Sequence, residues 1–197
     1  LSSQITEIGA VIYKNGNVID RFSTFANPGE PIPPNIVELT GITDDMVKDA
    51  PTPLEAVKAF LEFAGDRLLI AHNANFDMGF IKKVCEDHDL SLLNPYLDTL
   101  ALSRFLNPEL KKHKLDTLQE YFGLEEFNHH RADQDAEMLG KIFDAMIAKM
   151  RGEGICDLDA MMAGMANSCD PKKLKTHHII LLVKNSVGLK NLYKLVS

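Results

Sequence analysis

The chain has 197 residues, of which 45% are hydrophobic and 25% are charged, a composition typical of a globular domain. No apolar run is as long as a membrane span and no signal peptide opens the sequence, which argues against membrane-embedded and secreted proteins. The three cysteines, Cys85, Cys156 and Cys169, lie far apart without a CxxC pair, so neither a disulfide framework nor a zinc knuckle is predicted. We therefore expect a cytoplasmic protein.

The formal net charge of −7 argues against a protein that binds long duplex nucleic acid through the positive charge of its own surface. Residues 1–151 carry 15 Lys and Arg against 24 Asp and Glu, whereas residues 152–197 carry 6 against 4. An acidic domain can still act on a phosphodiester if bound cations offset the charge of the site and local basic loops hold the strand. Lys111–Lys114 and His129–Arg131 are the candidate loops, although solvated loop charge explains the lysines equally well.

The first part of the chain predicts a β-hairpin and then a loop. Apolar residues between Ile5 and Ile12 follow a strand pattern, and Val18–Phe25 has the pattern of a return strand. Between them, Lys14–Asn17 carries the Asn-Gly signal of a tight hairpin turn. The prolines of Asn27–Pro34 exclude regular structure there.

Helices are predicted next. A short helix is expected to end at Gly41, and Thr43 is expected to cap another. Thr52–Glu55 is a capping box with proline at the first helical position, which is a strong helix start. The buried face of that third helix is predicted to consist of Val57, Phe60, Leu61 and Ala64.

Asp77 follows a predicted buried strand and starts a helical pattern. Leu68–Ile70 is the short apolar run, and Ala71–Asp77 comes directly after it. From Asp77, the residues that recur at helical spacing are Phe80, Ile81, Val84 and His88. We therefore expect Asp77 to begin an apolar stripe at the N-terminal end of its helix.

A second carboxylate is expected in the same kind of place. After a strand at Tyr96–Thr99 and a helix through Phe105, a further helix is expected that is capped by Asp116 and ends at Gly123. A long amphipathic helix then begins near His130. Its core-facing residues are Leu139, Ile142, Phe143, Met146 and Met150. Asp135 lies on that stripe one turn before Leu139.

An ionised carboxylate that points toward a core needs a partner, and a metal ion is an adequate one. The alternative is that Asp133 and Asp135 only favour the helix N-terminus through its dipole. Asp77 and Asp135 together would suit divalent cations, which prefer hard oxygen ligands. His130 beside them could take a proton from a metal-bound water.

The order of elements predicts an α/β fold with a mixed sheet flanked by helices. The glycines and methionines of Gly152–Asp170 suggest a domain junction, and His177–Val183 predicts a new strand followed by an amphipathic helix. We therefore expect one domain over residues 1–151 and the start of another over residues 152–197.

Several segments in the expected order resemble the DEDDh 3′–5′ exonucleases, the proofreading family of the DNA polymerase III epsilon subunit. They are Glu7–Val11, His72–Asp77, Leu97–Leu100 and His129–Asp135. Pro31–Pro34, Glu38–Thr43 and Asp77–Phe80 look closest to the exonuclease built into PolC-type bacterial polymerases. The resemblance implies a ribonuclease-H-like exonuclease fold, and the tail resembles the resumption of the PHP domain in which PolC-type enzymes carry their exonuclease.

The resemblance also implies roles for single residues. Asp77 and Asp135 match metal ligands, and His130 matches the general base; the five-residue spacing to Asp135 selects it over His129. Substrate contacts are expected from Leu1, His72, Asn73 and Phe76, although Phe76 equally fits a core position. Two divalent ions, Mg²⁺ or Mn²⁺, would serve hydrolysis of a 3′-terminal phosphodiester of DNA, with the rest of the polymerase chain as partner.

The sequence departs from the family in its first motif, Asp-x-Glu-Thr-Thr-Gly-Leu, of which only Leu1 could match. We therefore expect both ends of the chain to lie inside a longer protein, with the first strand of the fold missing and the chain inactive and poorly stable alone. Asp98 and Asp133 are expected to be cap or surface residues, and Glu7 could support the site from behind.

Two alternatives remain open from the sequence. A stand-alone DEDDh nuclease that trims RNA or DNA would share the same motifs but not the PHP-like tail. A degenerate nuclease fold that serves as a nucleic-acid-binding or scaffold module would be expected to have lost His130, Asp77 or Asp135, which are all present.

Overall fold

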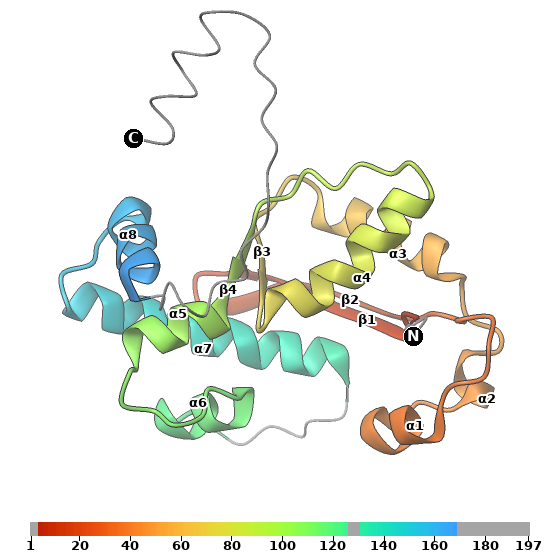
Figure 1. Ribbon diagram of the computed structural model, residues 1–197, viewed down its shortest axis with the longest axis horizontal. Helices are drawn as coiled ribbons and strands as arrows, with labels where there is room; N and C mark the ends of the chain where they lie inside the picture. Colours follow the sequence, from red (N-terminus) through yellow and green to blue (C-terminus); the bar gives the residue numbers. More distant parts are fainter. Residues whose placement is uncertain (1–3, 126–130, 169–197) are drawn as a thin grey trace, which may run out of the picture.

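An N-terminal β-hairpin forms where the sequence predicts one. The computed structural model describes residues 4–125 and 131–168 (Figure 1). Strands β1 (Glu7–Lys14) and β2 (Asn17–Phe25) pair antiparallel, with Glu7 opposite Phe25. Between them, Asn15 has φ 51° and Gly16 has φ 81°. Two consecutive left-handed residues match the right-handed twist of the flanking strands, so the Asn-Gly turn is confirmed.

The hairpin lies between two helices, α3 (Pro53–Ala64) and α7 (Ala132–Gly152), because its side chains alternate between faces. Ile8 and Ala10 join the apolar cluster built with α3. The alternate residues face α7, where the Gly9 backbone and the Tyr13 ring closely approach Ala132 and Gly140. Figure 1 shows α7 below the hairpin and α3 above it. The alternation thus seats the N-terminal turn of α7 directly on β1.

A second, parallel pair of strands carries the next part of the chain. Strands β3 (Leu69–Ala71) and β4 (Tyr96–Asp98) pair in parallel, and α4 (Ala74–Asp87) connects them. Helix α5 (Thr99–Leu106) follows β4 directly. Within the described ranges the strands form two two-stranded sheets, one antiparallel and one parallel. The mixed α/β class is confirmed, with the strands divided between two sheets.

Local signals set most of the other helix ends. Helix α1 (Pro34–Thr40) ends at Gly41 with φ 72°, and Thr43 precedes α2 (Asp44–Val47), as predicted. The Thr52 Oγ1 atom accepts from the Glu55 N–H at 3.3 Å, and a Glu55 carboxylate oxygen accepts from the Thr52 N–H at 2.8 Å. The predicted capping box of α3 is therefore confirmed.

A second core joins α5, α6 (Leu115–Tyr121), α7 and α8 (Leu158–Ser168). Its fully or nearly fully buried members are Leu102, Leu118, Met138, Ile142, Met146, Met150 and Met161. Helix α8 lies in the segment expected to be a junction, and it packs against α5. The division into domains at residue 151 stays a prediction, and the predicted strand at residues 177–183 lies outside the described residues.

Two expectations about helices need correction. Asp116 lies in the first turn of α6, and Lys114 occupies the cap position. In α4 the buried residues are Ala74, Met78, Ile81 and Cys85; of the predicted stripe, Ile81 is buried and Phe80 and Val84 pack against the same core, whereas Asp77 and His88 are exposed. Asp77 therefore lies at the edge of the buried face. Within residues 4–125 and 131–168, no helix combines the length and apolarity that crossing a bilayer would require.

Candidate active site

Asp77 lies in the first turn of α4, next to the end of β3. The chain enters α4 through Asn73, which adopts the left-handed conformation with φ 65°. The Asp77 carboxyl is exposed at the surface, yet the protein around it removes enough water to raise its pKa. The negative charge of Asp98 raises that pKa further. A bound cation would reverse both effects, so the position fits a metal ligand.

Asp98 connects the starts of two helices. One of its carboxylate oxygens accepts from the Leu100 N–H at 2.9 Å, which caps α5, and from the Asn73 N–H at 2.9 Å. The expectation that Asp98 is a cap residue is thus confirmed. The bond to Asn73 was not predicted, and it fixes the turn that leads to Asp77.

His72 is held on both sides of its ring. Its Nε2–H donates to the carbonyl oxygen of His113 at 2.7 Å, because a carbonyl can only accept. Its Nδ1 lies 3.0 Å from the Thr99 hydroxyl, and Thr99 is fully buried. Burial lowers the pKa of His72, as expected for an imidazole that is kept neutral. Neither ring nitrogen is left over for a direct hydrogen bond to substrate.

Phe76 is exposed rather than part of the core. Its side chain is 63% exposed, and its ring makes an edge-to-face contact with Phe80 at 5.1 Å between centroids. Nearby on the same helix, the Lys82 ammonium lies 4.5 Å from the centre of the Tyr96 ring. An exposed aromatic ring one residue before Asp77 is suited to stack on a base.

Asp135 is half-buried in the first turn of α7. Arg131, the residue before that helix, ties the helix start to the hairpin. Its Nε donates to a Glu7 carboxylate oxygen at 2.9 Å, and its guanidinium donates to the Ser23 hydroxyl at 3.2 Å. The guanidinium also lies 4.9 Å from the centre of the Phe25 ring. Arg131 is thus committed to these contacts, so it is not available as the strand-binding charge that the sequence suggested.

A second arginine reinforces the same connection. Arg21 on β2 pairs with Glu137 and, at 3.6 Å, with Asp133 on α7. Asp133 is therefore an ion-pair partner on the helix surface, in line with the expectation for it. Together the two arginines fix the end of α7 that carries Asp135 against the hairpin.

The remaining predicted site residues, Leu1, His129 and His130, lie outside the described residues. Within residues 4–125 and 131–168, no group of three or more His, Cys, Asp or Glu side chains is arranged to hold a metal ion. Asp77 and Asp135 come from different layers of the fold: α4 connects the two parallel strands, whereas α7 lies on the hairpin. In the view of Figure 1, the end of β3 at which α4 begins is directed toward α7.

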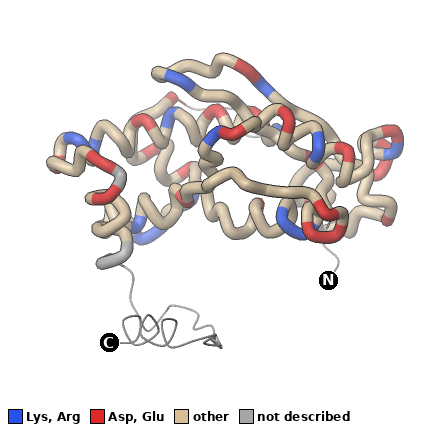
Figure 2. Tube along the Cα trace, turned by 90° about the horizontal axis from the view of Figure 1, so that it is seen from above, with Lys and Arg blue, Asp and Glu red and all other residues tan. Residues whose placement is uncertain are grey.

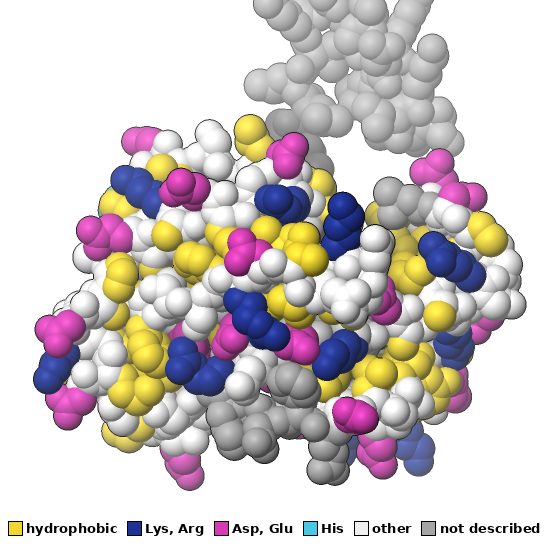
Figure 3. Space-filling model, turned by 180° about the vertical axis from the view of Figure 1, so that it is seen from behind, with side chains coloured by type: hydrophobic (Ala, Val, Ile, Leu, Met, Phe, Trp, Pro, Cys, Tyr) yellow, Lys and Arg dark blue, Asp and Glu magenta, His cyan; other side chains and the backbone are white. Residues whose placement is uncertain are grey.

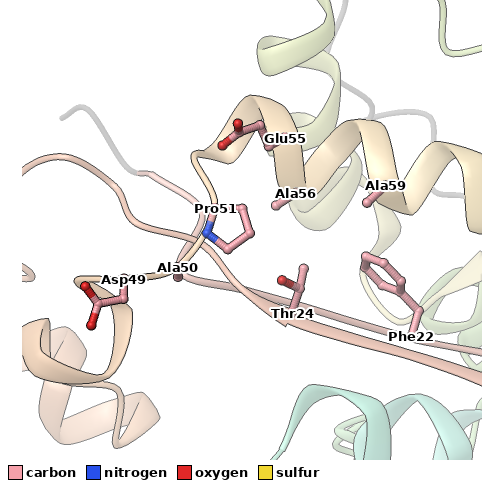
Figure 4. A pocket seen from close by; sticks show the side chains of 8 residues that line it. All are labelled: Phe22, Thr24, Asp49, Ala50, Pro51, Glu55, Ala56 and Ala59. Atoms are coloured by element: carbon pink, nitrogen blue, oxygen red, sulfur yellow. The ribbon is translucent and has the colours of Figure 1, made fainter.

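A pocket that is open to solvent lies elsewhere. It has a volume of about 560 Å³ and lies between β2, the 49–51 segment and α3 (Figure 4). Phe22 and Ala59 line one end, and Glu55, which already serves the capping box, lies at the other. None of the predicted site residues lines it, so it has no part in the chemistry of Asp77 and Asp135.

Known proteins resemble the chain in both sequence and fold. The sequence profile of a family described as Exonuclease matches residues 2–143. DNA polymerase III PolC-type of Clostridium perfringens is 47% identical over 197 residues, which is 100% of this chain and 14% of that protein. The PolC-type polymerase of Bacillus subtilis is 45% identical over 98% of this chain and 14% of that protein. The chain thus spans about 14% of the length of these relatives.

Two solved structures share the fold. Exonuclease X in complex with 5′ overhanging duplex DNA superposes with a TM-score of 0.61 at 24% identity, over 81% of this chain and 90% of that one. A 3′-exonuclease that recognises a histone mRNA stem-loop superposes with a TM-score of 0.52 at 14% identity, over 78% and 85%. The expected ribonuclease-H-like exonuclease fold is therefore confirmed.

Proposed function

The chain belongs to the exonuclease family, and from this premise we propose that it is the 3′–5′ proofreading exonuclease segment of a PolC-type replicative DNA polymerase. The observation that carries the proposal is the family match over residues 2–143, which includes Asp77, His130 and Asp135. Identity of 40–47% to PolC-type polymerases supports the polymerase context. The rest of that polymerase chain would be its partner, and the cytoplasm its location.

The proposed reaction is hydrolysis of the 3′-terminal phosphodiester of DNA with release of a 5′-nucleotide. DNA is favoured as substrate because the relatives of highest identity described above are DNA polymerases, and because one structural neighbour holds duplex DNA. RNA is the second candidate, since the other neighbour recognises an mRNA stem-loop. Rates of nucleotide release from DNA and RNA strands of the same sequence would separate the two.

Asp77 and Asp135 would hold the divalent ions, Mg²⁺ or Mn²⁺, that exonucleases of this kind use. Such ions polarise the phosphodiester and lower the pKa of the attacking water. The chain supplies the carboxylates and their placement. Asp98 fixes the turn before Asp77, and Arg131 fixes the helix start before Asp135. The raised pKa of Asp77 supports a site that gains from a cation.

His130 would act as the general base that takes a proton from the attacking water. Its neighbour in the chain, Arg131, is bonded to Glu7 and Ser23, so the point at which the His130 segment meets α7 is fixed. Phe76 would stack on the terminal base, and Asn73, exposed beside it, would contact the terminal nucleotide.

The proposal is tested by Asp135→Asn in the full-length protein that carries this segment. Loss of a negatively charged ligand should abolish exonuclease activity and leave nucleotide incorporation intact. Asp133→Asn is the matched control, because Asp133 lies in the same helical turn and Arg21 keeps its pair with Glu137 when Asp133 is neutralised. Exonuclease activity that survives Asp135→Asn would contradict the metal-ligand role. Loss of incorporation as well would show that Asp135 serves the fold.

A further inference from the structure

Basic side chains without an acidic partner gather around His113. Among the described residues, Arg104, Lys111, Lys112 and Lys114 are exposed and make no ion pair. Six of the eleven other described Lys and Arg residues pair with a carboxylate: Arg21, Lys48, Lys83, Arg131, Lys141 and Lys149. Charges of both signs are spread along the rest of the trace (Figure 2), and they intermix on the face shown in Figure 3. The five other described cations without an ion pair, Lys14, Lys58, Arg67, Lys82 and Arg151, are scattered over β1, α3, the segment after α3, α4 and α7. What distinguishes the four is therefore that they come together within residues 104–114 of a chain of net charge −7.

The loop that carries the lysines is fixed by buried polar groups. His113 lies in the segment between α5 and α6, and its carbonyl oxygen accepts from His72 Nε2 at 2.7 Å. Its ring Nδ1 lies 2.8 Å from the hydroxyl of Ser103, which is fully buried in α5. Lys112 and Lys114 flank His113 in the chain, so the same two bonds place their backbone. The loop is thus held against the turn that precedes Asp77.

Arg104 belongs to the same group. It follows Ser103 in α5, and the Ser103 hydroxyl lies 2.8 Å from the Nδ1 atom of His113, so Arg104 leaves the helix beside the 111–114 segment. The pKa of His72 and of His113 is lowered mainly by burial and also by the positive charge of Arg104. Four unpaired cations converge on one place because α5 and the 111–114 segment meet at His113.

We propose that Arg104, Lys111, Lys112 and Lys114 form a surface, here called the His113 surface, that binds the phosphates of the single strand entering the site. This inference rests on the proposed function and names how the strand is held. Several unpaired cations near a site that cuts a phosphodiester match a polyanionic strand, whereas a lone surface lysine would be only solvated charge.

The inference gives His72 a positioning role. Because both ring nitrogens are bonded within the protein, His72 acts on substrate through the loop that it holds. His72→Asn places its amide near the Nδ1 position and loses the donor that reaches the His113 carbonyl, so it should raise the KM for a long strand more than the KM for a substrate too short to reach the loop. A direct contact of His72 with the terminal nucleotide would instead raise both KM values equally.

The decisive experiment combines Lys111→Gln, Lys112→Gln and Lys114→Gln in the full-length protein. The exonuclease KM for oligothymidylate should rise about tenfold at low salt, and the slope of log(kcat/KM) against log[salt] should fall by about two, at roughly 0.7 per lost contact. Hydrolysis of the p-nitrophenyl ester of thymidine 5′-monophosphate should not change. Lys14→Gln with Lys58→Gln is the control, since both lysines are exposed on other elements, β1 and α3.

A second readout does not need turnover. In EDTA, oligothymidylate that contains 4-thiothymidine should crosslink on irradiation to the peptide spanning residues 104–114, and less so in the triple variant. An unchanged KM and salt slope, or a crosslink confined to other peptides, would overturn the proposal. Loss of ester hydrolysis in the triple variant would also overturn it, because the loop would then serve the fold. A crosslink in a wild-type protein without exonuclease activity would keep the surface and reject the proposed function.

Discussion

Gly9→Ala should displace the helix that carries Asp135. A Cβ atom added at Gly9 would lie 2.3 Å from the carbonyl carbon of Ala132 and 2.3 Å from the backbone nitrogen of Asp133, where ordinary contact begins at 3.4 Å. Both neighbours are backbone atoms, so no side chain can turn away. The start of α7 would have to withdraw by about 1 Å, and overpacking of this kind costs about 1–3 kcal/mol.

The effect on activity should exceed the effect on stability. A displacement of about 1 Å in a catalytic group can lower the rate about 100-fold, so exonuclease activity of the full-length Gly9→Ala variant should fall by that order. Gly152→Ala, at the other end of α7, is the matched control because a Cβ there meets nothing within 4 Å. Exonuclease rates, with nucleotide incorporation as internal reference, measure both variants. A Gly9→Ala variant as active and as heat-resistant as Gly152→Ala would refute the reasoning.

Three further predictions follow from the site. Asp77→Asn should stabilise the metal-free protein by about 0.5 kcal/mol after allowance for solvent screening, because it removes a desolvated charge near Asp98. Thermal melts in EDTA should show this gain in stability, and melts in Mg²⁺ should show that the variant is no longer stabilised by the ion. Because burial lowers the pKa of His72, the unfolded chain binds more protons than the folded one, so the free energy of unfolding should decrease as pH falls below about 6.5, the ordinary pKa of histidine. His72→Gln should make the melting temperature depend less on pH over this range. The same dependence on pH in the variant and the wild type would contradict the prediction. Glu7→Gln should lower the exonuclease rate several-fold, because Arg131 loses its charged partner and the helix start before Asp135 is held less firmly. An unchanged rate would exclude a positioning role for Glu7.

Local chemistry made much of the fold predictable. The Asn-Gly turn, the glycine that ends α1 and the Thr52 capping box each depend on residues a few positions apart, and all are confirmed. The stripe of α7 was predictable for the same reason, since Leu139, Ile142, Met146 and Met150 repeat on one helical face and are buried.

Features set by distant residues were not predictable. Arg131 and Glu7 are 124 positions apart, and nothing near either one signals their ion pair. The two ends of the predicted α4 stripe, Asp77 and His88, are exposed, because packing against α3 and the parallel strands buries Met78 and Cys85 beside Ile81. The division of the strands between two sheets likewise depends on pairing between distant segments.

The sequence predicted the residues of the site better than the hydrogen bonds that hold them in place. Asp77 and Asp135 do lie in the first turns of their helices, as the pattern indicated. Phe76 fitted both a core and a contact position in the sequence, and it is exposed. The bonds of His72 to Thr99 and His113 join three separate segments, so no spacing rule could have revealed them.

The most direct test of the central claim is the direction of digestion. Single-stranded DNA labelled at its 5′ end should be shortened by the full-length protein into a ladder of progressively shorter labelled products in Mg²⁺, with release of 5′-nucleotides, and should stay intact in EDTA. Immediate release of the label as a mononucleotide, or no digestion in Mg²⁺, would contradict the assignment of a 3′–5′ exonuclease.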